Sequence, residues 1–187
     1  LKVLFEDALR MGLSFEPPNV NRGTHRFEPV SDRQIRYGLS AIKGTGQQAI
    51  EAIVAAREGR GAGPLAGDNR PFSSLFDFCA RVDRSRLNKR TVEALIKAGA
   101  FDTLQRNRAS LLASVDLAFD FGSAMLANAN QTSLFDMGGD DEHGASTQEP
   151  PLLPATPWGV REQLSMEKAA VGFYLSGHLF DESVTEV

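Results

Sequence analysis

The feature that most constrains this chain is a pair of glycines around a single residue, in the segment Lys43-Gly44-Thr45-Gly46. Apolar Leu39 and Ile42 lead into this segment, and apolar residues resume at helical spacing from Ala49 to Ile53. Glycine tolerates backbone angles that other residues avoid, so two glycines allow the chain to reverse within a few residues. The pattern therefore predicts a helical hairpin with a tight turn at 43–46.

The helix that follows this turn is a predicted phosphate site. The first N–H groups of a helix lack partners inside the helix, and the positive end of the helix dipole attracts anions. Lys43 adds a positive charge beside them. We therefore predict that Lys43, Gly44, Thr45 and Gly46 contact nucleic-acid phosphate. The alternative interpretation is that the two glycines form only a tight turn between helices.

The net charge of −4 conceals a strong asymmetry along the 187 residues. Residues 1–56 contain 7 basic and 6 acidic side chains, and residues 57–108 contain 11 and 6. Residues 109–187 contain 2 basic and 12 acidic side chains. The basic middle segment is suited to phosphate, whereas the acidic C-terminal segment is repelled by it or solvated. An ordinary solvated surface is the alternative interpretation of the basic segment.

The sequence contains no pattern typical of catalysis or of metal binding. Cys79 is the single cysteine, which excludes a disulfide framework and a thiolate metal cluster, and we expect it in the core. The three histidines, His25, His143 and His178, are far apart. We predict no catalytic residue, no metal and no cofactor in this chain. Without a membrane-spanning run or a signal peptide, and with no initial methionine, it is interpreted as a piece of a longer cytoplasmic protein that does not bind membranes.

The periodicity predicts a mainly α fold (α+β) with one small β-hairpin. Turn residues and capping residues such as Ser73, Ser74, Asn88 and Asn107 separate the predicted elements. We expect helices over 1–11, 47–57, 89–98, 107 to about 127 and 160–170, a short helix after Ser74, strands over 26–30 and 35–39, a surface loop over 59–71, and disorder over most of 127–157.

A second hairpin is predicted about fifty residues after the first. Asn88, Lys89 and Arg90 open a helix that Gly99 closes. Two hairpins side by side would contact phosphates on both strands of a duplex without reading its sequence. Arginine guanidinium groups suit phosphate oxygens. The predicted contacts here are Arg86, Asn88, Lys89, Arg90, Gly99, Arg106 and Arg108, although each arginine alone is also compatible with a solvated side chain.

A candidate partner-binding peptide follows, with the sequence Gln131-Thr132-Ser133-Leu134-Phe135. Large apolar residues in an acidic, glycine-rich segment have no local core to join, and such residues often enter a groove on a partner. Leu134 and Phe135 would fill the pocket, and Gln131 would provide a specific hydrogen bond. The alternative is that Leu134 and Phe135 fold back onto this protein.

Several longer motifs resemble one protein family, the alpha subunits of bacterial replicative DNA polymerase III, which belong to the C family of DNA polymerases. The resemblance covers nearly the whole chain in order. The motifs that carry it are Arg36–Gly46, Ser74–Asp83, Asn88–Arg90, Glu93–Asp102, Glu167 and Gly172–His178.

The resemblance implies a domain organisation. Residues 1–35 would end the fingers region, and residues 36–130 would form a tandem helix-hairpin-helix domain that binds duplex DNA. Residues 131–157 would contain the clamp-binding peptide and a flexible acidic linker, and residues 158–187 would lead towards an OB domain.

The resemblance also implies a function. The chain would hold the backbone of the primer–template duplex and tether a DNA-directed DNA polymerase to the sliding clamp. Other replicase subunits would bind parts of the parent protein outside this chain. The aspartates that bind the divalent metal, Mg²⁺ as we expect, would lie upstream in the palm, so the chain itself would have no polymerase, nuclease or hydrolase activity.

Two residues depart from the family pattern. Thr45 replaces the apolar residue that is usual between the hairpin glycines, and Leu179 follows His178 where the family usually has proline. Two alternatives to the polymerase interpretation also stay open at this point. One is a non-enzymatic DNA-repair module with tandem hairpins and a clamp peptide, and the other is a structural helical spacer whose hairpins are only turns.

Overall fold

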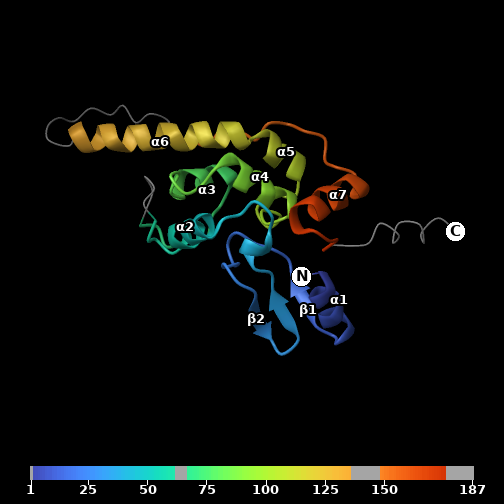
Figure 1. The fold of residues 1–187 in the computed structure, drawn as a ribbon. Helices are drawn as coiled ribbons and strands as arrows, with labels where there is room; N and C mark the ends of the chain where they lie inside the picture. The colour runs from blue at the N-terminus through green and yellow to red at the C-terminus, as the bar shows by residue number, and fades with distance from the viewer. Residues whose placement is uncertain (1, 62–66, 136–147, 176–187) are drawn as a thin grey trace.

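The fold is mainly helical with a small sheet, as the sequence predicts, and residues 2–61, 67–135 and 148–175 are described by a computed structural model. Figure 1 shows most of the helices gathered in one body, with the sheet and the first helix on one side of it. The helices are α1 (Lys2–Arg10), α2 (Gln47–Arg57), α3 (Leu75–Arg81), α4 (Lys89–Lys97), α5 (Arg108–Ala113), α6 (Val115–Phe135) and α7 (Val160–Val171), with the 3₁₀ turn η1 (Leu39–Ala41).

The predicted helix starts are confirmed by the capping residues. The side chain of Ser74 accepts a hydrogen bond from the amide of Asp77 at the start of α3. Asn88 and Asn107 cap α4 and α5 in the same way. Such side chains replace the acceptors that the first helical turn lacks. Local capping chemistry therefore sets these three boundaries.

The small sheet contains one strand more than the sequence predicts. Strands β2 (Glu28–Ser31) and β3 (Gln34–Arg36) form the expected antiparallel hairpin. Strand β1 (Ser14–Glu16) pairs parallel to β3, which gives the order β1-β3-β2. Three residues are too few for an alternating pattern, so β1 depends on tertiary contacts. Its Glu16 carboxylate accepts a hydrogen bond of 3.0 Å from the Arg36 guanidinium on β3.

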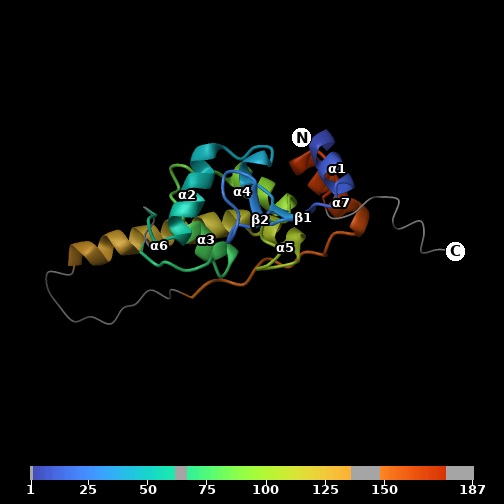
Figure 2. The same cartoon turned by 90° about the horizontal axis from the view of Figure 1, so that it is seen from below.

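The hydrophobic core surrounds α4, whose Val92, Leu95 and Ile96 are fully buried. Segments from both ends of the chain reach the same core, through Val20 near the N-terminus and Phe173 after α7. Figure 2 shows α1 and α7 side by side at one end of the body. The rings of Phe5 on α1 and Phe173 lie 4.5 Å apart. The predicted domain boundaries at 35/36 and 157/158 stay predictions, and the core crosses both.

The predicted single helix from Asn107 to about Ala127 is wrong in two respects. It breaks at Ser114 into α5 and α6, and α6 continues to Phe135. The hydroxyl of Ser114 donates to the Ser110 carbonyl at 2.7 Å and accepts from the Leu153 amide at 2.8 Å. Ser114 thus joins the break to a segment 39 residues later in the chain.

That later segment is also different from the prediction. Residues 148–159 are extended and lie against α5, whereas disorder was expected over most of 127–157. The amide of Ala155 donates to Ser110 Oγ at 3.1 Å, and its carbonyl accepts from Asn107 Nδ2 at 2.9 Å. A proline-rich backbone without periodicity resembles a disordered one, but here polar side chains of α5 satisfy its hydrogen bonds. Residues 136–147 of the predicted linker lie outside the described part.

Arg81 is a fully buried arginine that the sequence does not distinguish from exposed ones. Its guanidinium donates to the carbonyls of Ala56, Asp68 and Arg70, and to the Asp77 carboxylate at 3.2 Å. It therefore ties the end of α2 and the described C-terminal end of the predicted 59–71 loop to α3. Burial alone would raise the pKa of Asp77, but hydrogen bonds from Arg70 and the Ser73 amide and the charge of Arg81 lower it.

Arg108 is buried as well, with 5% of its side chain exposed. Its Nε and Nη2 atoms donate to both carboxylate oxygens of Asp102, at 2.8 and 2.5 Å. Nη1 lies 3.5 Å from the Glu167 carboxylate on α7, which is itself 1% exposed. Burial alone would lower the pKa of Arg108, but the bond to Asp102 and the charge of Glu167 raise it, so the guanidinium stays charged. Nη1 also donates a hydrogen bond of 3.2 Å to the Lys97 carbonyl, so Arg108 links α4, α5 and α7.

We predict that Gly122→Ala destabilises the protein because α6 crosses α3 at this glycine. A Cβ atom at position 122 would lie 2.6 Å from the Cys79 carbonyl oxygen on α3. Backbone atoms at a helix crossing cannot move independently, and overpacking of this kind costs about 1–3 kcal/mol. Urea unfolding should show the loss. Gly159→Ala is the control, since nothing lies within 4 Å of a Cβ atom there, and equal stability of the two variants would contradict the prediction.

A second stability prediction compares two neighbouring arginines. Arg108→Ala should lower the free energy of unfolding by about 3–5 kcal/mol, because it removes a buried cation that pairs with the Asp102 carboxylate and faces the buried Glu167 carboxylate. Arg106 is exposed, and Arg106→Ala should change stability by less than about 0.5 kcal/mol. Denaturant titration of both variants tests this. A small effect of Arg108→Ala would show that the buried ion pair is dispensable.

Candidate nucleic-acid interface

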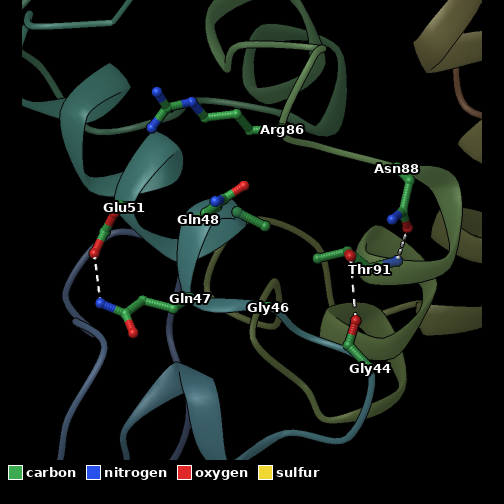
Figure 3. Close-up of a pocket in the computed structure, with 9 residues that line it drawn as sticks. Gly44, Gly46, Gln47, Gln48, Glu51, Arg86, Asn88 and Thr91 are labelled. Atoms are coloured by element: carbon green, nitrogen blue, oxygen red, sulfur yellow. Dashed lines mark hydrogen bonds between the residues drawn. The ribbon is translucent and has the colours of Figure 1, made fainter.

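A groove of about 660 Å³ lies between the start of α2 and the start of α4. Figure 3 shows that α2 contributes one wall, while Asn88 and Thr91 at the start of α4 contribute the other. Arg86 extends across the groove from the loop before α4. The residues that line the groove are Gly44, Gly46, Gln47, Gln48, Ala49, Glu51, Arg86, Asn88 and Thr91.

The glycine turn takes the conformation that the sequence predicts. Gly44 has a φ of +86°, in the left-handed region that favours glycine. Its carbonyl accepts a hydrogen bond of 3.2 Å from the Thr91 hydroxyl, which holds the turn against α4. The element before the turn, however, is the 3₁₀ turn η1 rather than an α-helix, because the chain enters it directly from β3. The predicted helical hairpin is therefore correct only in its second helix.

Thr45 provides a second anchor for the turn. Its hydroxyl lies within hydrogen-bond distance of the Leu39 carbonyl, at 2.8 Å, and of the Ile42 carbonyl, at 2.6 Å. The hydroxyl therefore points back into the turn and stabilises it. Its amide also bonds within the turn, to the Ile42 carbonyl at 3.3 Å. The role that the structure supports for Thr45 is to shape the turn.

Backbone amides that have no acceptor within the described residues lie at the helix starts on both sides of the groove. On the α2 side these are the amides of Gly44, Gly46, Gln47 and Gln48, because Gly46 is the N-cap and no side chain caps the helix. On the α4 side Asn88 satisfies the Thr91 amide, which leaves the amides of Lys89 and Arg90. Two positive helix ends thus open towards one groove, an arrangement suited to an anion.

Formal charge around the groove is modest. Arg86 is exposed and forms a long ion pair of 3.7 Å with Asp83. Glu51 stands on the α2 side and accepts a hydrogen bond of 2.8 Å from the Gln47 side chain. Lys43 and Arg90 are exposed beside the groove and do not line it. Neutral donors therefore outnumber cations among the lining residues.

The second predicted hairpin does not form a second site of the same kind. Gly99 is buried, and its amide donates to the Ile96 carbonyl at 3.0 Å. A Cβ atom at Gly99 would lie 2.3 Å from the Arg108 guanidinium, which covers it. Gly99 and Arg108 therefore have structural contacts in this conformation, and their predicted contact with phosphate stays a prediction. The N-terminal end of the same hairpin, at Asn88, instead completes the groove of the first.

Two further predicted contacts lie elsewhere on the surface. Lys89 forms an ion pair with Asp116 on α6, and this hydrogen bond raises the pKa of Lys89. Its ammonium group also lies 6.0 Å from the centre of the Phe119 ring, so the side chain leans towards α6. Arg106 is exposed before α5, at the opposite end of α4 from the groove.

Gln47, Gln48 and Thr91 are groove residues that the sequence analysis missed. The two glutamines follow the glycine turn directly, and this position at the start of a helix was a usable signal. No local sequence pattern marks Thr91 as a groove residue, because its contact with Gly44 joins residues 47 positions apart.

The predicted partner-binding residues Gln131, Leu134 and Phe135 lie in the last five residues of α6. Their backbone is helical, and their side chains lie outside the described part of the structure. Figure 1 shows this end of α6 extending beyond α3 and away from the body. The predicted contact with a partner stays a prediction.

None of the described helices has both the length and the apolar character needed to cross a membrane. The described part also contains no group of three or more His, Cys, Asp or Glu side chains that could hold a metal ion.

Comparison with known proteins identifies the family. Residues 12–111 match the family described as helix-hairpin-helix motif. The chain is 45% identical over 187 residues to DNA polymerase III subunit alpha of Neisseria meningitidis serogroup B, covering 100% of this chain and 15% of that protein. The proteins of the same name from Escherichia coli and Vibrio cholerae are 35% and 38% identical over 189 residues, covering 98% of this chain and 15% of each.

This chain therefore spans about 15% of the length of these relatives. It belongs to the helix-hairpin-helix family, and over its whole length it is similar to one part of DNA polymerase III subunit alpha.

Proposed function

We propose that the groove between α2 and α4 binds the phosphate backbone of double-stranded DNA. The observation that carries this proposal is the convergence of two helix starts on one groove: the uncapped start of α2, and the start of α4, where the Asn88 cap satisfies the Thr91 amide and leaves the amides of Lys89 and Arg90 free within the described residues. Amides at a helix start bind phosphate oxygens without reading bases, so binding should be independent of sequence. An affinity of roughly 10⁻⁴ to 10⁻⁶ M at physiological salt is typical of such contacts.

The relatives support a larger proposal for this groove. Because they are DNA polymerase III alpha subunits, we infer that the parent protein is a DNA-directed DNA polymerase and that this chain holds its primer–template duplex. The catalytic aspartates, their Mg²⁺ and the surfaces for other replicase subunits would belong to the rest of that protein, in the cytoplasm. The relatives do not favour the alternative of a DNA-repair module.

A proline substitution tests whether backbone amides bind the phosphate. Gln47 is the first residue of α2, a position that proline favours because its amide has no helical partner. Gln47→Pro therefore removes one free amide with little effect on the helix, whereas Gln47→Ala keeps it. Hydrogen bonds to charged groups contribute about 1.5–3 kcal/mol. We expect Gln47→Pro to bind labelled duplex at least tenfold more weakly than Gln47→Ala, as measured by fluorescence anisotropy.

Salt dependence provides an independent measurement for the same groove. The plot of log K against log salt has a negative slope, and each lost cation–phosphate contact reduces its magnitude by about 0.9. The double variant Arg86→Ala with Arg90→Ala should therefore show a flatter plot. The Gln47 variants should keep the wild-type slope because they remove no cation. Equal affinities for Gln47→Pro and Gln47→Ala would contradict the amide contact, and absence of duplex binding by the wild type would favour a purely structural role.

We further propose that Gln131–Phe135 binds the sliding clamp of the replicase. The peptide lies at the end of a helix that projects from the body (Figure 1), where a partner could reach it. The turn before it contains Asn128 and Asn130, and asparagine has a low helix propensity, which favours an extended peptide at this end of α6. A weak grip on DNA and a weak tether to the clamp, once linked, give a long residence time on DNA.

Replacement of both anchors tests the clamp proposal. Burial of Leu134 and Phe135 contributes roughly 1.5–3 kcal/mol each, and ordering the peptide offsets part of that gain, so we expect micromolar affinity. Leu134→Ala with Phe135→Ala should abolish binding in a titration of labelled clamp, and Gln131→Ala should weaken it less. Leu126→Ala, on the same helix but outside the peptide, is the control. Unchanged clamp binding by the double variant would exclude this peptide as the tether, and its duplex binding should equal that of the wild type.

A further inference from the structure

The phosphate-binding turn is attached to the end of α7, an element more than one hundred residues away in sequence. The amide of Lys43, immediately before Gly44, donates a hydrogen bond of 2.8 Å to the Ala170 carbonyl. Ala170 is in the last turn of α7, where carbonyls lack helical partners. The Lys43 amide satisfies one of these carbonyls and at the same time fixes the start of the turn.

Gly172 gives the end of α7 the shape that this contact needs. It is the C-cap, with a φ of +98°, and its amide donates to the Lys168 carbonyl at 2.7 Å. A Cβ atom at Gly172 would lie 3.5 Å from Lys43 Cε, an ordinary van der Waals distance. A Cβ atom therefore fits at position 172, and the left-handed backbone restricts which residue can occupy it.

Glu167 fixes α7 from its buried side. Its carboxylate accepts a hydrogen bond of 2.6 Å from the Leu175 amide, which closes the chain back onto the helix after Gly172. It also faces the Arg108 guanidinium at 3.5 Å, and Arg108 in turn donates a hydrogen bond of 3.2 Å to the Lys97 carbonyl at the end of α4. One helix, α7, thus contacts the glycine turn near the start of α4 and the ion pair near its end.

We propose that the C-terminal end of α7, from Ala170 to Gly172, is a positioning element for the phosphate-binding turn. It acts through the Lys43 amide and keeps the free amides of Gly44 and Gly46 aimed at the groove. This inference rests on the proposed binding of duplex DNA. It adds that the conformation of α7, and of the segment that follows it, sets the affinity for phosphate although neither lines the groove.

A series at position 172 separates backbone shape from side-chain size. Asn tolerates a left-handed backbone, Ala less so, and a β-branched Val least. A net hydrogen bond changes an equilibrium constant by roughly two- to tenfold. We expect Gly172→Val to bind duplex about tenfold more weakly, Gly172→Ala to be intermediate, and Gly172→Asn to recover most of the loss. Gly159→Val, at the other end of the same helix with a φ of −64° and open space, should bind like the wild type.

Hydrogen exchange of the Lys43 amide provides the second measurement. It should become faster in the same order as affinity falls, because the Ala170 carbonyl is its acceptor. Circular dichroism identifies any variant that fails to fold, and Gly172→Ala and Gly172→Asn then decide the outcome. Faster exchange at Lys43 with unchanged duplex affinity would overturn the inference alone. Absence of duplex binding in the wild type would instead overturn the proposed function on which it rests.

Discussion

The hydrogen bond between the Thr91 hydroxyl and the Gly44 carbonyl is the contact on which the candidate site depends, because it joins two helix starts. Neither start is a strong anion site alone, since α4 is capped by Asn88 and the α2 side also contains the Glu51 carboxylate. Held together, they direct the free amides of both helices to the same groove. The buried side chains of α4 keep its start in place, so the hydrophobic core and the groove are coupled through one helix.

Burial, rather than residue type, decides what each arginine does. The basic segment 57–108 suggests a strongly positive surface, but Arg81 and Arg108 neutralise buried or half-buried carboxylates and bridge elements instead. Arg86 is the arginine that lines the groove. A site with few cations and many neutral donors depends on geometry, and its affinity should vary less with salt than the formal charge of the segment suggests.

The sequence predicts the features that depend on neighbouring residues, and it does not predict those that depend on contacts between distant segments. Capping by Ser74, Asn88 and Asn107 and the left-handed turn at Gly44 depend on residues within four positions, so the sequence predicts them. The break at Ser114 depends on a partner 39 residues away and leaves no periodic trace. Gly99 resembles Gly44 in sequence because both follow apolar residues. The Arg108 side chain that covers Gly99 comes from the next helix, so the local sequence does not reveal it.

In a site built from backbone amides, the affinity for phosphate depends on the residues that hold the backbone in position. Thr45 and Thr91 hold the glycine turn by hydrogen bonds to main-chain carbonyls, and the Lys43 amide holds it to Ala170. None of these three bonds carries formal charge, so salt screens them little, and each fixes a direction as well as a distance. The turn is held from η1, from α4 and from α7, so displacement of any one of these elements would misalign the amides. Substitutions that weaken phosphate binding should therefore extend well beyond the residues that line the groove.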